Sequence, residues 1–201
     1  MSALTESACR EYLQSTGASR GAAAELTSTR ALTPMLATSS TPGLARDAAR
    51  RWGPWVEVKW DGVRAIGYVD GGRLRLEARS GRDITPRYPE LRELGRALGT
   101  HEAILDGEVV SFEGGVPSFQ RLQKRMHLTS EAQVRRLSQT EPVVYIVFDL
   151  LWLDGHSLTD LPYTERRERL LELGLQGDRW MTPAHHVGDG TAMLEIGRAN
   201  V

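Results

Sequence analysis

The residues with the clearest chemical potential lie around Lys59. Glu57 and Asp61 stand two positions on either side of this lysine, and Arg64 follows three positions after Asp61. Because side chains alternate along an extended chain, Glu57, Lys59 and Asp61 would share one face of a strand. One interpretation is a solvated face whose ion pairs each stabilise the protein by about 0–1 kcal/mol. The other is a reactive lysine flanked by carboxylates.

Lysine is used sparingly in this chain. Of its 25 basic Lys and Arg residues, 23 are arginine, and the two lysines are Lys59 and Lys124. A lysine amine can act as a covalent nucleophile once it is deprotonated, whereas the arginine guanidinium stays protonated. The lysine at position 59 therefore favours a covalent role, with a metal-bound nucleotide phosphate as the electrophile.

Five segments carry a resemblance to a known family. LysTrpAspGlyValArg at 59–64 resembles the Lys-x-Asp-Gly-x-Arg motif of ATP-dependent DNA ligases, RNA ligases and mRNA capping enzymes. The segments at 79–91, 105–110 and 148–155 resemble, in the same order, the motifs that follow in ATP-dependent DNA ligases. ProSerPheGlnArgLeuGln at 117–123 is similar to bacterial ligase D-type enzymes. The RNA ligase and capping-enzyme alternatives share the lysine motif but not the ArgSerGlyArgAsp and PheAspLeuLeuTrpLeuAspGly contexts.

The resemblance implies a nucleotide site around the lysine. Lys59 would attack the α-phosphorus of ATP, with Mg²⁺ and basic side chains neutralising charge, and would form a lysyl-AMP intermediate. By match to the motifs, Glu57 would lie beside the adenine and Arg64 near the ribose. Phe148 would stack on the base, although without the other motifs an ordinary core position is the favoured interpretation.

Three further residues receive roles from the same resemblance. Asp61 would support the lysine and its turn. Arg79 would contact the nucleotide or a DNA end phosphate, with a surface charge at a strand end as its simpler interpretation. Glu108 would bind the ribose hydroxyls or support the metal ion.

The implied reaction passes AMP to the 5′-phosphate of nicked double-stranded DNA, so the expected partners are such DNA and proteins of end joining or repair. Arg121, Lys124 and Arg125 would either contact DNA phosphates or form a solvated helix face.

The single cysteine, Cys9, excludes a disulfide framework within the chain. No apolar run reaches the ~20 residues of a membrane span. We therefore expect a cytoplasmic, nucleoid-associated protein that does not enter membranes.

The patterning predicts an α+β fold. Residues 1–30 are expected to be a flexible tail, and 31–201 the adenylation domain, whose family fold has two mainly antiparallel sheets flanked by helices and is ATP-grasp-like. Alternation at 55–60, followed by AspGly at 61–62, predicts a hairpin. The other expected strands are 63–69, 73–79, 102–112 and 143–153, and the expected helices are 87–99, 118–126, 130–138 and 163–173.

The sequence also departs from the family pattern. The chain ends at Val201, before the Glu-Gly and Lys-x-Lys strands and the OB-fold domain that the resemblance leads us to expect. These observations leave two hypotheses open. The chain is the adenylation part of a working ligase, or it is a truncated remnant that binds nucleotide or a repair partner without joining DNA.

Overall fold

The computed structural model describes residues 34–35 and 55–188. The expected tail at 1–30 lies outside the described residues. The strands are β1 Trp55–Val56, β2 Val63–Asp70, β3 Arg73–Ala78, β4 Ala103–Glu113, β5 Val116–Pro117, β6 Val143–Leu153, β7 His156–Ser157, β8 Gln176–Gly177, β9 Trp180–Met181 and β10 His186–Val187. The helices are η1 Thr85–Arg87, η2 Pro89–Leu91, α4 Glu93–Ala97, α5 Phe119–Met126, α6 Glu131–Thr140 and α7 Tyr163–Glu172. In this part of the chain, no helix has the length and apolar character needed to cross a membrane.

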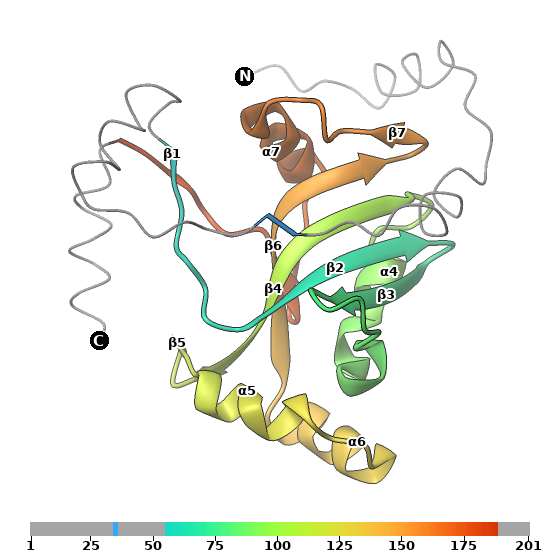
Figure 1. Ribbon diagram of the computed structural model, residues 1–201, viewed down its shortest axis with the longest axis vertical. Helices are drawn as coiled ribbons and strands as arrows, with labels where there is room; N and C mark the ends of the chain where they lie inside the picture. Colours follow the sequence, from blue (N-terminus) through green and yellow to red (C-terminus); the bar gives the residue numbers. More distant parts are fainter. Residues whose placement is uncertain (1–33, 36–54, 189–201) are drawn as a thin grey trace.

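A large mixed sheet dominates the fold (Figure 1). Its strands run in the order β3-β2-β4-β6-β9-β8, with β5 paired to β4 and β7 to β6. The pairs are antiparallel except for β6 with β9. A second, two-stranded sheet joins β1 to β10. The predicted α+β class is confirmed, and the two sheets of the described residues differ greatly in size.

Helices cover one face of the large sheet and share a core with it. Alternate residues of β2 and β4, such as Ala65, Leu105 and Val109, point into this core together with Leu94 of α4 and Leu170 of α7. The opposite parity carries Arg64 on β2 and Asp106 and Glu108 on β4, because side chains alternate along a strand. These three polar residues therefore lie on the face away from the main core.

The expected helix at 87–99 is broken into shorter pieces. Pro86 and Pro89 lie in the two 3-10 helices, and regular α-helix begins only at Glu93. A proline disfavours helical geometry in the residue before it, which explains the interruption. The apolar spacing was nevertheless informative, since Leu91, Leu94 and Leu98 are all buried.

The predicted hairpin around 61–62 is wrong. Only Trp55–Val56 forms a strand, and it pairs with Val187 and His186 of β10, away from the large sheet (Figure 1). Both edges of β2 are already occupied, by β3 and β4, so no edge remains for a preceding strand. The expected apolar face is not formed either, since Val58 is 47% exposed.

Candidate active site

Lys59 lies in an irregular segment that ends against β4. Its side chain is exposed, and the segment closes at Gly62, whose backbone N–H donates to Glu108. A Cβ atom at position 62 would lie 2.2 Å from the carbonyl oxygen of Val109, which is shorter than any allowed contact. The AspGly pair therefore marks a close backbone approach to β4, and glycine is the residue that permits it.

We expect Gly62→Ala to displace the segment that carries Lys59. A misplacement on the order of 1 Å near reacting groups costs about 10–100-fold in rate, so lysine adenylation should slow by that factor. The measurement is the rate at which protein-bound AMP forms from ATP. Gly67→Ala on β2 is the control, because the three atoms nearest to its Cβ belong to the side chains of Tyr145 and Leu74, at 3.2–3.4 Å. Equal rates in wild type and Gly62→Ala would contradict this prediction.

Arg64 links β2, β4 and β6 on the polar face of the sheet. Its Nε and Nη2 donate to Oδ1 and Oδ2 of Asp106, each over 2.6 Å. Its guanidinium carbon lies 4.5 Å from the centre of the Phe148 ring. The bidentate geometry fixes the guanidinium plane. Burial raises the pKa of Asp106, and the Arg64 guanidinium opposes that shift.

Glu108 stands opposite Arg64 in the strand register and is strongly perturbed. Burial raises its pKa to about 7, although the charges of Arg64 and Lys59 act in the opposite direction. The influence of Lys59 on this carboxyl places the lysine in its electrostatic neighbourhood. A half-buried carboxyl with a raised pKa next to basic groups is typical of functional sites.

This shift predicts a pH dependence of stability. The pKa of Glu108 is higher in the folded chain, at about 7, than its ordinary value of 4.5, so the folded state binds the proton more tightly. The contribution of Glu108 to stability should therefore be full below pH 4.5 and decline as the pH rises towards 7. Urea unfolding of wild type and Glu108→Gln across this range measures it. A difference between the two proteins that stays constant with pH would contradict the assignment.

Phe148 is placed by a β-bulge. Val147 of β6 pairs with Gly107 and Asp149 pairs with Asp106, so Phe148 has no partner in β4. Bulges often redirect a side chain next to an active site. Two side chains of α7 meet the Phe148 carbonyl oxygen: Arg167 Nη1 donates to it over 2.9 Å, and the Tyr163 hydroxyl oxygen lies 3.3 Å from it.

The same two residues hold Glu57. The Tyr163 hydroxyl donates to Glu57 Oε1 over 2.6 Å, and Arg167 Nη2 lies 3.6 Å from that oxygen. Sequence reasoning missed Tyr163 and Arg167. Their i, i+4 spacing on a predicted helix indicated a shared face. Nothing local indicated that this face meets Glu57, more than a hundred positions earlier.

The predicted residues are not all equally connected. Arg64, Glu108 and Phe148 gather on the sheet with Lys59 in their electrostatic reach, and Glu57 is tied to the Phe148 backbone through α7. Asp61 and Arg79 are exposed, and neither makes a hydrogen bond or ion pair within the described residues.

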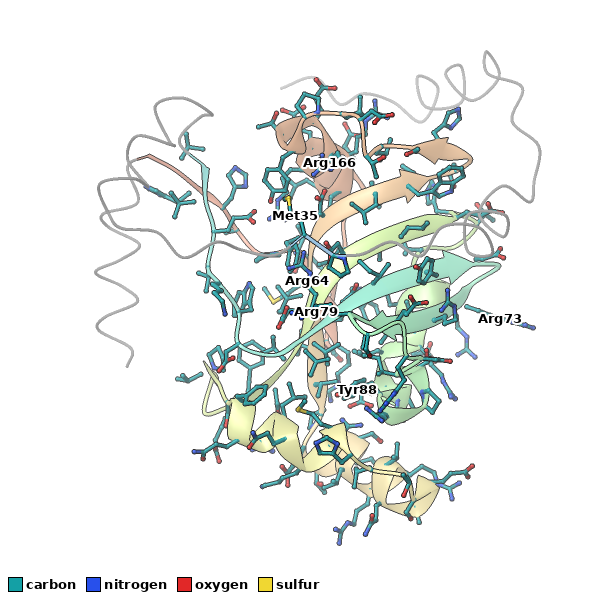
Figure 2. All side chains as sticks on the ribbon, viewed as in Figure 1. Met35, Arg64, Arg73, Arg79, Tyr88 and Arg166 are labelled. Atoms are coloured by element: carbon teal, nitrogen blue, oxygen red, sulfur yellow. The ribbon has the colours of Figure 1, made fainter. Side chains whose placement is uncertain are left out.

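Arg79 nevertheless lies at the site's end of the sheet. It directly follows β3, whose Ala78 pairs with Ala65, the residue after Arg64. Figure 2 labels both arginines at this end of the β2–β3 pair. Among the described residues no carboxylate pairs with Arg79, so its predicted contact with a phosphate stays a prediction.

Metal binding would depend on few protein ligands. Among the described residues, no three His, Cys, Asp or Glu side chains gather in a way that could hold an ion. Asp106 is occupied by Arg64, which leaves Glu108 as the other carboxyl of β4 beside the lysine segment. Mg²⁺ commonly takes one or two carboxylates together with substrate phosphates and water, and this donor set fits that pattern.

The fold and these motifs define a class of nucleotidyltransferase domain. Residues 34–190 match the family of the ATP dependent DNA ligase domain, and the chain belongs to this family.

Similar proteins agree with this assignment. The chain is 38% identical over 163 residues to a multifunctional non-homologous end joining protein LigD of Mycolicibacterium smegmatis, covering 81% of this chain and 19% of that protein. It is 37% identical over 141 residues to DNA ligase C of Mycobacterium tuberculosis, covering 70% of this chain and 37% of that protein. The chain thus spans about a fifth to two fifths of the length of these relatives.

Solved structures show the same relationship. The ligase domain of M. tuberculosis LigD superposes with a TM-score of 0.66 at 36% identity, over 84% of this chain and 51% of that one. A mycobacterial DNA ligase D complexed with ATP and MES gives the same TM-score and coverage at 35% identity.

Proposed function

We propose that this chain forms a lysyl-AMP intermediate from ATP. The Lys59 amine, after losing a proton to solvent, attacks the α-phosphorus; the N–P bond forms, the bond to the bridging oxygen breaks, and pyrophosphate leaves. The observation that supports this proposal is the gathering of Arg64, Glu108 and Phe148 on one sheet face beside the Lys59 segment.

The surrounding residues would each serve this step. Arg64, fixed by Asp106, provides positive charge and a planar donor set near the sugar and phosphates. Phe148 offers an aromatic surface to the base, and Glu57 an acceptor for its polar edge. Asp61 would support the turn that carries the lysine.

Magnesium belongs to this proposal as well. Glu108 is the residue that would hold Mg²⁺, or alternatively the ribose hydroxyls. A bound Mg²⁺ would neutralise negative charge on the triphosphate. A cation at this position would also favour the ionised form of the Glu108 carboxyl, whose pKa is raised to about 7.

We further propose nicked duplex DNA as the acceptor of AMP. The 5′-phosphate at the nick would take AMP from Lys59, and the neighbouring 3′-hydroxyl would then displace AMP to join the strand. Arg79 would contact the DNA end phosphate. The names of the LigD relatives support a role in end joining with repair proteins, and a DNA substrate would place the chain at the nucleoid.

The test follows labelled AMP from nucleotide to nucleic acid. The chain is incubated with α-labelled ATP or GTP and Mg²⁺, and the protein-bound label is then chased with nicked DNA, intact DNA or nicked RNA. Label from ATP that moves to nicked DNA is the expected result. Label from GTP would favour a capping-type transferase, and transfer to RNA alone would favour an RNA ligase. A folded chain that binds ATP but never becomes labelled would contradict the proposed function and support the binding remnant.

A further inference from the structure

One helix holds two parts of the proposed base site that lie far apart in the sequence. Tyr163 and Arg167, one turn apart on α7, both approach the Glu57 carboxylate and the Phe148 carbonyl oxygen. Glu57 stands two residues before Lys59, and Phe148 occupies the bulge of β6. The helix therefore couples the irregular lysine segment to the sheet.

The need for this coupling follows from the backbone. Residues 57–62 belong to no strand, so no ladder of hydrogen bonds fixes their position. A carbonyl group at a bulge likewise needs a donor from elsewhere when it is shielded from water. Arg167, whose side chain is fully buried, donates to the Phe148 carbonyl and also to the carbonyl of Pro183. Arg167 therefore holds these two backbone carbonyl groups in place.

Tyr163 fixes the carboxylate of Glu57 through a hydrogen bond. Burial, together with the hydrogen bond to Glu57, raises the pKa of its hydroxyl well above the ordinary value, so the hydroxyl stays protonated and remains a donor. It engages Oε1 of Glu57. Within the described residues Oε2 has no such partner, which leaves one carboxylate oxygen to accept a hydrogen bond from a ligand.

We propose that Tyr163, supported by Arg167, is a positioning residue that sets the preference of the site for a purine with a 6-amino group. The geometry gives the reason: Tyr163 holds Oε1 of Glu57 and thereby fixes the position of Oε2 in relation to Phe148. A purine that stacks on the Phe148 ring would direct its 6-amino donor to this oxygen. This inference rests on the proposed function for the location of the nucleotide.

The test compares two nucleotides in the absence of chemistry. Isothermal titration calorimetry without Mg²⁺ measures the Kd of ATP and of purine riboside triphosphate, which lacks the 6-amino group, for the whole chain. Tyr163→Phe removes one hydroxyl and keeps the ring. Glu168→Gln is the control, because Glu168 is an exposed residue of the same helix that makes no hydrogen bond or ion pair within the described residues. Near-ultraviolet circular dichroism verifies that both variants are folded.

We expect Tyr163→Phe to weaken ATP binding by ~3–10-fold, the range for one hydrogen bond, while the analogue binds within about twofold of wild type. Glu168→Gln should bind both nucleotides as wild type does. Equal weakening of both nucleotides in Tyr163→Phe would show a merely structural role, and no change in either would show no role; each result overturns the inference. Because binding needs no lysyl-AMP, a chain that binds ATP without becoming labelled refutes the proposed function and still decides this inference. A wild-type chain that binds neither nucleotide refutes both.

Discussion

Lys59→Arg and Lys59→Ala are expected to abolish the formation of protein-bound AMP. Arginine keeps the positive charge but stays protonated and cannot form the N–P bond, and alanine has no amine at all. The loss should be complete within detection, at least ~10³-fold, because removal of a nucleophile eliminates the covalent step. Intact-mass spectrometry after incubation with ATP and Mg²⁺ measures the result.

The second lysine of the chain provides the control for this experiment. Lys124 is the other lysine, and its exposed side chain lies 3.2 Å from Glu141 on the protein surface. Lys124→Ala should form the adduct at the wild-type rate. An adduct that persists in Lys59→Arg, or one that disappears in Lys124→Ala, would contradict the assignment of Lys59 as the nucleophile.

Glu90→Ala is expected to lower the free energy of unfolding by about 3–5 kcal/mol, the cost of leaving a buried charge without its partner. Arg125 is fully buried and forms an ion pair with Glu90, whose side chain is 8% exposed. Arg125 Nη2 also donates to the carbonyl oxygen of Arg87 over 2.6 Å. The pair joins α5 to the segment before α4, so its loss should destabilise this whole side of the fold. Urea unfolding measures the change.

Lys124→Met provides the matched comparison on the same helix. Its ion pair with Glu141 is solvent-exposed, so the substitution should change the free energy of unfolding by less than about 1 kcal/mol. The double variant Glu90→Ala with Arg125→Met should recover part of the loss, because it removes the buried charge as well. A change in Glu90→Ala as small as that in Lys124→Met would refute this account of the pair.

The sequence predicted the elements whose signals are local. The apolar run at 143–153 coincides with β6, and Ser118 begins the predicted helix by accepting a hydrogen bond from the backbone N–H of Arg121. The 55–60 segment shows the limit of such reasoning. Its alternation is that of a strand, but Trp55–Val56 pairs with β10, more than a hundred residues later. Residues 57–60 pair with no strand.

The site, like the fold, has residues that local motifs predict and contacts that depend on strand pairing. The motifs at 59–64 and 105–110 predicted Lys59, Arg64 and Glu108, and the structure places them in one electrostatic neighbourhood. Asp106 lies in the 105–110 motif, yet its hydrogen-bonded ion pair with Arg64 depends on the β2–β4 register.

Arg125 shows what the sequence could not predict. The helix pattern suggested a solvated or DNA-facing residue, and both interpretations are wrong because the side chain is buried against Glu90. Burial of a long cation depends on a distant carboxylate, which no local pattern reveals.

The most direct test of the central claim is to locate the AMP on the chain. Trypsin cleaves after unmodified lysine and arginine, so AMP on Lys59 should block cleavage there and leave one adenylated peptide spanning 52–64. We expect this peptide after incubation with ATP and Mg²⁺, with Lys124 unmodified. AMP on a peptide that contains Lys124 but not Lys59, or no AMP on a folded chain, would contradict it.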